Sequence, residues 1–216
     1  TPNLYLRLDD TWEQFYGRRS RRLKKGNNLV RNKLEAQFKS IEVAHVSGEG
    51  TESFLNDVIR ISGASWKSTT GTTFDQPGPR AFIGKLSEHA ASHGWLSGFV
   101  LYLDGRAAAT EYQLNYEGDI HALRADFDMD LEKWSPGTYL NMELLRRLFG
   151  TGKKRYLMGP GANPYKLRWA EHSEELVELR ATSSNLKARA ISTCSASLKV
   201  AKRFRERMTP AKPITE

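Results

Sequence analysis

Hydrophobic and polar residues alternate with different periods along the first quarter of the chain, and the change of period separates helix from strand. Apolar side chains recur every three or four positions from Thr11 to Phe38, which predicts a helix that Gly26-Asn27-Asn28 breaks or kinks. Ile41–Val46 alternates with a period of two, as a half-buried strand does. A second helix, with Thr51 or Ser53 as its N-cap, is expected to follow.

The middle of the chain predicts a loop, a helix and an antiparallel meander. Gly, Ser, Thr and Pro are frequent from Ser65 to Arg80, so we expect a loop there and a helix at Ala81–His93. Three strands are expected to follow, and the tight turns Asp104-Gly105 and Glu117-Gly118-Asp119 join them as hairpins. These strands are Leu96–Leu103, Ala107–Tyr116 and Ile120–Phe127.

The last third of the chain predicts further helices and strands. A leucine stripe marks the core face of a helix from about Tyr139 to Phe149, which Ser135-Pro136-Gly137-Thr138 opens. From Asn185 to Met208 the apolar spacing predicts an amphipathic helix, which packs back on the domain or docks on a partner. Between these two helices we expect the strand Arg155–Met158, the short helix Pro164–Ala170 and the strand Glu175–Ala181.

The segment Gly159–Trp169, Gly-Pro-Gly-Ala-Asn-Pro-Tyr-Lys-Leu-Arg-Trp, is the most informative stretch. Two glycines and two prolines directly after a strand make a sharp bend that exposes the backbone. A tyrosine, a lysine, an arginine and a tryptophan then follow within five residues and can form a cationic, aromatic-walled site. The same residues also fit an ordinary strand-to-helix turn with core aromatics, and the segment alone leaves both interpretations open.

Composition indicates one good core, or one domain with an appended arm. The chain has 216 residues, 24.5 kDa, 39% hydrophobic and 10% aromatic residues. No apolar run approaches the roughly 18 residues of a membrane helix, and the start shows no signal-peptide pattern. The single cysteine, Cys194, rules out an internal disulfide and fits a reducing compartment, so we expect a cytoplasmic protein. Because Thr1 stands where Met would, we expect a piece of a longer product.

Positive charge gathers in two stretches of the chain. A formal net charge of +8 and a pI near 9.6 favour an anionic partner, which leaves nucleic acid, a phosphorylated cofactor, an anionic glycan and a membrane surface open. One basic group lies near the carboxyl end. The other lies between Gly17 and Leu34, where no acidic residue occurs, so this helical face is either solvated or occupied by an anion. Its members are Arg18, Arg19, Arg21, Arg22, Lys24, Lys25, Arg31 and Lys33.

Taken in order, these elements resemble the GNAT acyltransferase fold, an α+β fold. The expected architecture is a mixed sheet with an antiparallel meander, flanking helices, an N-terminal basic helical arm and a C-terminal amphipathic helix. The resemblance runs from about Leu4 to Ala181, and Gly161-x-x-Pro-Tyr-Lys-x-Arg-Trp169 is its most specific motif. Together the motifs are similar to those of the cellulose-biosynthesis (CelD-like) acetyltransferase branch, which is related to Fem-type aminoacyltransferases. The other motifs are the opening Tyr5-Leu6-Arg7-Leu8-Asp9, then Ser65-Trp66-Lys67, Gly94-Trp95 and Ser135-Pro136-Gly137.

This resemblance implies three parts of the chain. They are a basic helical arm or linker at residues 1–40, a GNAT-like acyltransferase domain at 41–184, and an amphipathic helix with a tail at 185–216. Members of the branch often consist of two GNAT-like halves in tandem, and this chain resembles the second half. An amino-terminal GNAT-like half is therefore an expected partner.

The resemblance also implies an acyl-carrier site between the strand before Pro136 and the strand that ends at Met158. The donor would be an acyl-CoA, with acetyl-CoA the first choice. Backbone amides at a helix start favour its pyrophosphate. The usual Arg/Gln-x-x-Gly-x-Gly/Ala pattern is imperfect here, since Trp134 and Tyr139 occupy two of its positions, so a ligand-free helix start fits as well. The implied cofactor-binding residues are Ser135, Gly137, Thr138, Tyr139 and Asn163.

Acyl transfer needs a base for the nucleophile, a stabilised oxyanion and a proton donor for the leaving thiolate. The resemblance implies that Tyr165 is this donor, and a tyrosine pKa near 10 suits the role. The base candidates are Glu111 on the middle meander strand and His121 and Asp126 on the last one, and the sequence does not choose among them. No cluster of His, Cys and Asp has metal-ligand spacing, so no metal is expected.

Three functions follow from these observations. The first is transfer of an acyl group from a thioester carrier to a small-molecule or glycan acceptor, such as a sugar, amino sugar or amino-acid unit of the cell envelope. The second is Fem-like transfer from aminoacyl-tRNA, which the basic arm favours. The third is a GNAT-like domain without catalysis that binds a partner. The substrate-binding candidates are Trp66, Lys67, Lys166, Arg168 and Trp169.

Overall fold

The structure, a computed structural model, describes residues 1–48, 50–177 and 179. Its strands are β1 Pro2–Arg7, β2 Ile41–Val46, β3 Leu96–Leu103, β4 Arg106–Tyr116, β5 Asp119–Phe127, β6 Arg155–Pro160 and β7 His172–Glu175. Its helices are α1 Trp12–Gly17, α2 Arg21–Gln37, α3 Thr51–Ala64, α4 Pro77–Ser92, α5 Pro136–Leu148 and α6 Pro164–Leu167, and two 3₁₀ helices are η1 Trp66–Thr70 and η2 Met129–Trp134.

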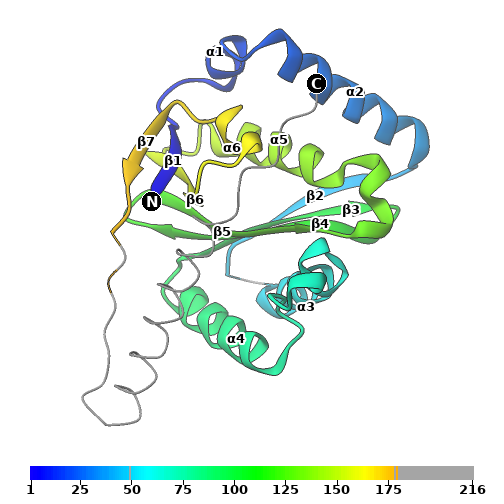
Figure 1. Ribbon diagram of the computed structural model, residues 1–216, viewed down its shortest axis with the longest axis vertical. Coiled ribbons are helices and arrows are strands. Elements are labelled where there is room, and N and C mark those ends of the chain that lie inside the picture. Colours follow the sequence, from blue (N-terminus) through cyan, green and yellow to red (C-terminus); the bar gives the residue numbers. More distant parts are fainter. Residues whose placement is uncertain (49, 178, 180–216) are drawn as a thin grey trace, which may run out of the picture. The chain divides into compact units, whose positions relative to one another are not determined.

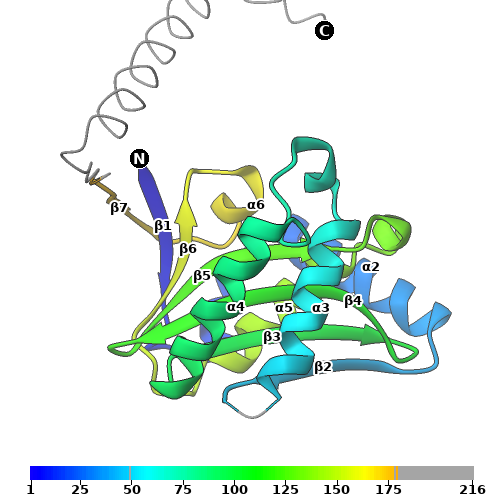
Figure 2. The ribbon, with the colours of Figure 1, turned by 90° about the horizontal axis from the view of Figure 1, so that it is seen from below.

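The described strands form one seven-stranded sheet in the order β2-β3-β4-β5-β6-β1-β7. Helices α1, α2 and α5 cover one face, and α3 and α4 cover the other (Figures 1 and 2). β2 to β5 pair as an antiparallel meander, and the strand limits expected for it are within one residue of those observed. The α+β fold class expected from the sequence is confirmed.

One strand pair differs from its neighbours and positions the site. β5 and β6 run parallel, and their ladder holds three residue pairs, from Asp119–Arg155 to His121–Leu157. β5 continues to Phe127 and β6 to Pro160, so in the described part of the chain both strands extend beyond their last shared pair. The two strands therefore separate at their carboxyl ends, where a parallel sheet offers side chains and backbone to a ligand.

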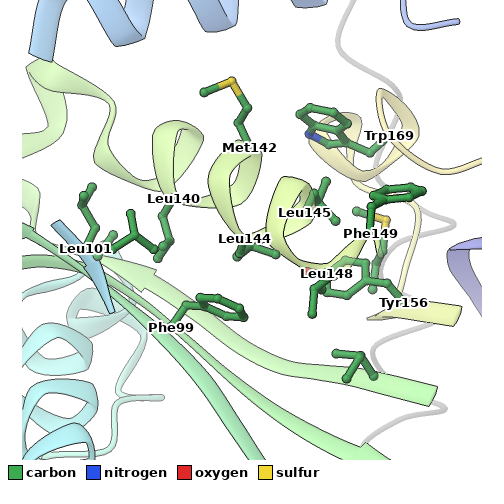
Figure 3. Packing of buried hydrophobic residues seen from close by; sticks show 14 of the residues in the cluster. Phe99, Leu101, Leu140, Met142, Leu144, Leu145, Leu148, Phe149, Tyr156 and Trp169 are labelled. Carbon is green, nitrogen blue, oxygen red and sulfur yellow. The ribbon is translucent and has the colours of Figure 1, made fainter. Parts of the chain in front are cut away.

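The core above the sheet fixes the start of α5 beside this opening. Leu140, Leu144, Leu145 and Leu148 are buried on one side of α5, as their spacing predicts, and they pack toward the sheet near Phe99 (Figure 3). On the opposite face, α3 and α4 bury a second cluster. The packing on both faces holds the meander rigid, which is what a site at the strand ends requires.

The helix expected across residues 11–38 is interrupted at a different point from the one predicted. It ends at Gly17 and restarts at Arg21, because Ser20 acts as an N-cap and its side chain accepts the Leu23 amide hydrogen. Gly26-Asn27-Asn28, the predicted break, lies inside α2. The N-cap of α3 is also corrected, since Gly50 takes that position in place of Thr51 or Ser53.

Two further boundaries differ from the sequence expectation. The segment 65–80 is not wholly loop, because it contains η1 and because α4 begins at Pro77, where proline lacks the amide hydrogen that a helix start leaves unpaired. The last described strand is β7, which ends at Glu175, where the prediction 175–181 began. β7 ends there because it pairs with β1, a strand that the sequence analysis did not anticipate.

The amino-terminal residues are part of the sheet and of the core. β1 lies between β6 and β7, and Phe15 and Leu34 are fully buried in the same cluster as the leucines of α5. Residues 1–40, expected as an arm, lie within the compact unit Thr1–Leu176. The C-terminal helix predicted at 185–216 lies outside the described residues, as does the predicted boundary at residue 184.

Candidate active site

A cleft of about 1170 Å³ opens where β5 and β6 separate. Helix α2, η1, the carboxyl-terminal part of β5, the middle of β4, the start of α5 and the segment around α6 all contribute to it. Eleven sequence-derived candidates line this cleft: Trp66, Lys67, Glu111, Asp126, Ser135, Gly137, Thr138, Asn163, Tyr165, Arg168 and Trp169. His121, Tyr139 and Lys166 are not part of its lining.

Glu111 is a buried carboxylate held by neutral groups. It is 3% exposed, and its Oε1 accepts hydrogen bonds from the Tyr156 hydroxyl at 2.6 Å and the Gln113 amide at 2.7 Å. Burial raises the pKa of Glu111, and these two hydrogen bonds offset part of the shift. Both bonds end on Oε1 of this cleft-lining side chain, and neither involves Oε2.

Asp126, the other buried carboxylate of the cleft, is neutralised by two cations. Lys67 Nζ lies 2.6 Å from its Oδ1, and Arg124 Nε lies 2.5 Å from its Oδ2. Lys67 also donates to the Ala125 carbonyl at 2.9 Å, so it fastens η1 to the end of β5. Burial lowers the pKa of Lys67, and its bond to Asp126 offsets part of that shift. Lys67 is therefore a structural cation at the cleft wall, while Trp66 beside it is 53% exposed.

Tyr165 extends from α6 into the same cleft, and the charge of Glu111 affects its pKa. Loss of hydration raises its pKa to about 12, and the negative charge of Glu111 is the second cause. The side chain is 46% exposed, so a substrate can reach it from solvent. The phenol consequently stays protonated at neutral pH, and its acidity depends on whether Glu111 carries a proton.

The start of α5 offers fewer free amides than the sequence suggests. Ser135 has φ 55° and ψ 49°, in the left-handed region, where residues other than glycine are uncommon. In this conformation its carbonyl accepts the amide hydrogens of both Thr138 and Tyr139. Pro136 has no amide hydrogen, so the Gly137 amide is left at this end of α5 without an intrahelical acceptor.

Gly137 has a packing reason to be glycine. A Cβ at this position would lie 3.2 Å from the Phe127 ring, which also lines the cleft. The close approach of α5 to the end of β5 therefore depends on Gly137. Tyr139 was predicted, together with Gly137, to bind the cofactor. It is half-buried and does not line the cleft, because it follows Thr138 in the helix and its side chain therefore points to another side.

Lys166 does not have the substrate-binding role that the sequence suggested. It is 5% exposed, and its Nζ donates to the carbonyls of Gly159 and Pro160 at 2.8 and 2.9 Å. Burial lowers its pKa. Lys166 therefore closes the loop after β6 by satisfying backbone carbonyls that the bend exposes.

Trp169 is mainly a core residue at the inner edge of the cleft. It is 4% exposed and stacks near Phe15 and Tyr16, and it lies beside Leu145 and Phe149 in the core (Figure 3). His121 is half-buried on β5, opposite Leu157, on the paired part of the strand rather than the separated part. Its distance from the opening explains why it does not join Glu111.

Sequence reasoning missed the wall that α2 contributes. Five of its residues line the cleft: Arg22, Leu23, Gly26, Asn27 and Val30. These residues recur at helical spacing. An analysis of the helical period that included polar as well as apolar positions could therefore have placed them on one face. Their contact with the cleft depends on how α2 crosses the sheet (Figure 1), which local sequence does not encode.

The basic stretch between Gly17 and Leu34 is less available than its charge suggests. Arg18 pairs with Asp10 and Glu171, and Arg19 pairs with Glu171 and donates to the Trp169 carbonyl at 2.8 Å. These two arginines therefore attach the amino-terminal segment to the chain after α6. Arg22, in contrast, faces the cleft.

Two classes of site are not found in the described part of the chain. Residues 1–48, 50–177 and 179 contain no group of three or more His, Cys, Asp or Glu side chains that could hold a metal ion. Among these same residues, none of the helices has both the length and the apolar character needed to cross a membrane.

The sequence matches the family described as "Acetyltransferase (GNAT) domain" over residues 17–167. The chain therefore belongs to the GNAT acetyltransferase family, as the order of its elements implied. The match includes α2, the meander, α5 and most of the segment that follows β6. The comparison with curated proteins gives no match.

Solved structures share the fold at low sequence identity. FemX superimposes with a TM-score of 0.57 and 8% identity over 80% of this chain and 58% of that one. L-PGS from Bacillus licheniformis gives a TM-score of 0.50 and 16% identity over 76% of this chain and 48% of the other. At these identities the likeness shows the fold alone. The chain spans about half the length of each of these two structures.

Proposed function

We propose that this chain is an acyltransferase that moves an acyl group from acyl-CoA, or another thioester carrier, to an amine or hydroxyl. The observation that carries the proposal is the pairing of Glu111 and Tyr165 in one cleft of a GNAT domain. Glu111 has a raised pKa and neutral partners, and Tyr165 stays protonated. Two titratable groups with such different environments fit a general base and a general acid.

In the first step Glu111 takes a proton from the acceptor as its nitrogen or oxygen attacks the thioester carbonyl. A raised pKa makes this carboxylate a stronger base than an exposed glutamate. Tyr156 and Gln113 hold Oε1, so the carboxyl plane is oriented before the substrate arrives. The tetrahedral intermediate then collapses and the carbon–sulfur bond breaks.

In the second step Tyr165 donates its proton to the leaving thiolate. A phenol with a pKa of about 12 is a weak acid relative to a thiol near 8.5, so donation is unfavourable while Glu111 is charged. Once Glu111 has taken the acceptor's proton, its charge no longer raises the Tyr165 pKa, while loss of hydration, the larger cause, remains. The base step therefore makes the acid step less unfavourable, and return of the proton from Glu111 to the Tyr165 phenolate restores both groups for the next cycle.

The donor is proposed to lie between the separated ends of β5 and β6, with its phosphates near the Gly137 amide, Thr138 and Arg22. These groups combine a helix start with a cation at one side of the cleft. Trp66 and Arg168, which also line the cleft and are exposed, are proposed to contact the acceptor. Membership in the CelD-like branch, and with it a sugar, amino-sugar or amino-acid acceptor of the cell envelope, rests on the motif at Gly161–Trp169.

Isothermal titration of the chain with acetyl-CoA, a longer acyl-CoA and bulk tRNA tests the donor. Saturable thioester binding that Thr138→Trp weakens at least tenfold would support the proposal. Lys85→Trp on the exposed side of α4 is the control and should bind as the wild type does. Thr138 serves better than Gly137, whose replacement would press on Phe127 and disturb the fold.

A Fem-like transfer from aminoacyl-tRNA is the second candidate, because the basic stretch of α2 fits a phosphate backbone. Arg21 and Lys25 are the residues to reverse, since Arg18 and Arg19 already pair with carboxylates. Arg21→Glu with Lys25→Glu should abolish binding to tRNA and leave acyl-CoA binding unchanged. Binding to tRNA alone would favour this candidate, and binding to none of the three would favour a domain without catalysis.

A further inference from the structure

A chain of hydrogen bonds crosses the sheet from its edge to Glu111. His45 lies on the edge strand β2 and is exposed. Its Nε2 lies 3.1 Å from the hydroxyl of Ser97 on β3, and this hydroxyl donates to Oε1 of Gln113 on β4 at 3.3 Å. The Gln113 amide nitrogen in turn donates to Glu111 Oε1 at 2.7 Å. A surface imidazole is thus connected to the buried carboxylate of the cleft.

The strand register brings these side chains to one face of the sheet. Ser97 lies opposite Gln113, and Phe99 lies between Glu111 on one side and His45 on the other. Residues two apart in a strand point to the same side, so all five side chains share that face. His45 stacks on Phe99, with ring centroids 4.5 Å apart and an interplanar angle of 24°. This stacking holds the imidazole beside Ser97.

The carboxylate determines the direction of every bond in the chain. An ionised carboxylate only accepts, so Gln113 must turn its amide nitrogen toward Glu111 and its carbonyl toward Ser97. The single hydrogen of the Ser97 hydroxyl is then used, and Ser97 Oγ accepts from His45. His45 therefore carries a proton on Nε2, and all three bonds point from the edge of the sheet toward Glu111.

Stability alone does not explain a polar chain in this place. Ser97 and Gln113 are 4% and 0% exposed, on the face of the sheet that the main core covers. Replacing two buried hydrogen-bonded partners by apolar groups of the same shape is nearly neutral for stability. Hydrogen bonds that run in one direction, however, polarise one another and strengthen the last bond of the series. The chain therefore makes Gln113 a better donor to Glu111 than an isolated amide would be.

We propose that His45 is a positioning residue for the general base, because through Ser97 and Gln113 it orients the donor at Glu111 Oε1 and stabilises the carboxylate before the acceptor arrives. This inference rests on the proposed acyltransferase function, in which Glu111 is the base. His45 is not part of the cleft lining, so it acts through the two intervening side chains. Without the His45 donor, Glu111 should stay protonated, and unable to act as a base, up to a higher pH.

Groups outside this chain of hydrogen bonds act on both of its ends. Loss of hydration, and then the positive charge of Arg147 on α5, lowers the pKa of His45. The imidazole is therefore neutral at neutral pH, and it contributes a hydrogen bond there rather than a charge. At the other end, Tyr156 donates to the same Oε1, and Tyr165 is a further titratable group on which the charge of Glu111 acts.

His45→Phe tests the proposal, since it keeps an aromatic ring on Phe99 and removes the donor. The readout is the titration of the Glu111 carboxyl itself, followed by NMR of the full chain with isotope-labelled glutamate, in which Glu111→Gln identifies the signal. The midpoint should move to higher pH. His45→Gln should restore it, because the glutamine amide nitrogen lies about where the histidine Nε2 does. His45→Asn is too short to reach Ser97 and should titrate as His45→Phe does.

His172→Phe is the matched control. His172 is also a histidine on an edge strand, β7, and stacks on Tyr5 of the neighbouring strand with ring centroids 5.1 Å apart. None of the hydrogen bonds among the described residues joins it to Glu111. The Glu111 midpoint should therefore be the same in His172→Phe as in the wild type.

The outcomes separate this inference from the function on which it rests. A Glu111 midpoint that His45→Phe leaves unchanged, or that His45→Gln does not restore, would overturn the positioning role alone. In steady-state rates of thiol release, His45→Phe should lower kcat on the acidic side of the pH profile and change the plateau less than about twofold, since the base itself remains. A wild-type kcat in Glu111→Gln would overturn the proposed function, whatever the His45 variants do.

Discussion

Two neighbouring strands each contribute a buried carboxylate to the cleft, and their surroundings are opposite. Asp126 on β5 lies between two cations, Lys67 and Arg124. Glu111 on β4 has two neutral partners, Tyr156 and Gln113, and its pKa is raised by burial. The sequence offered both as candidate bases, since both are acidic residues on strands of the meander.

The difference shows how environment assigns roles to identical chemical groups. Both carboxylate oxygens of Asp126 are occupied by cations, so none is left for a substrate. A carboxylate that is desolvated and hydrogen-bonded by neutral donors gains by taking a proton. Asp126 is therefore expected to hold the cleft wall together, and Glu111 is expected to act in the reaction.

Among the variants that test this comparison, Glu111→Gln is expected to have the largest effect on kcat. Glutamine can keep the hydrogen bonds of Tyr156 and Gln113 at its oxygen but cannot take a proton, so kcat should fall about 10²- to 10⁴-fold. Steady-state rates of thiol release from acyl-CoA, measured with an acceptor found by screening, check this. A variant that retains more than a tenth of the wild-type kcat would remove Glu111 from the mechanism.

Glu111→Gln should also change how the free energy of unfolding depends on pH. Because burial raises the pKa of Glu111, the folded chain keeps this proton at pH values where the unfolded chain has lost it, so this group's contribution to stability falls as pH rises through that window. Glu111→Gln has no such loss. Its free energy of unfolding should equal or exceed that of the wild type at pH 8, and the two should converge near pH 4, in urea titrations.

Asp126→Asn should show the reverse combination. Removing the charge leaves Lys67 and Arg124 partly buried without their anion, which should lower the free energy of unfolding by about 3 kcal/mol. KM should rise because η1 loses its attachment to β5, while kcat at saturation stays within about threefold. Denaturant unfolding and steady-state kinetics on the same preparation test this, and a kcat loss as large as that of Glu111→Gln would invalidate the division of roles.

Tyr165→Phe is expected to reduce kcat about 10²-fold with carrier affinity changed less than twofold, because only the proton donor is removed. Since the wild-type pKa of Tyr165 is about 12, the pH–rate profile of the wild type should show no alkaline decline from this group below about pH 11. An alkaline limb near pH 9 that Tyr165→Phe abolishes would contradict the stated environment of the phenol.

Tyr156→Phe should have the smallest effect on the rate among these variants, and that effect should be specific to the pH dependence. The Tyr156 hydroxyl lowers the pKa of Glu111, so its removal should move the acidic limb of the pH–rate profile to higher pH. The loss of rate should thus be larger on the acidic side of the profile than on the alkaline side. Tyr102→Phe is the control, because that hydroxyl donates to Asp57 at 2.7 Å outside the cleft and should leave the profile unchanged.

Local sequence was sufficient for much of the fold. The meander was predicted closely because its tight turns contain glycine at left-handed positions, Gly105 and Gly118. β1 was missed because its partners β6 and β7 lie more than 140 residues away in the chain. Edge pairing of this kind depends on the final packing rather than on a local period.

The segment after β6 shows the same difference, within a few residues, between what local sequence predicts and what the packing decides. Tyr165 and Lys166 are adjacent, and nothing in the sequence distinguishes their roles. α6 turns Tyr165 into the cleft and turns Lys166 inward to the carbonyls of Gly159 and Pro160. Successive residues of a helix point about 100° apart, so one residue of register decides between a site residue and a structural one.

The sequence by itself determined the GNAT order of elements, the meander and the cleft segment after β6, because each of these depends on residues close together in the chain. Tertiary structure alone decided that α2 forms a wall of the cleft, that Lys67 neutralises Asp126, and that Glu111 is left with neutral partners. These are contacts between distant residues, and desolvation and charge pairing act through space. The chemistry of the cleft was therefore settled by which side chains the fold brought together.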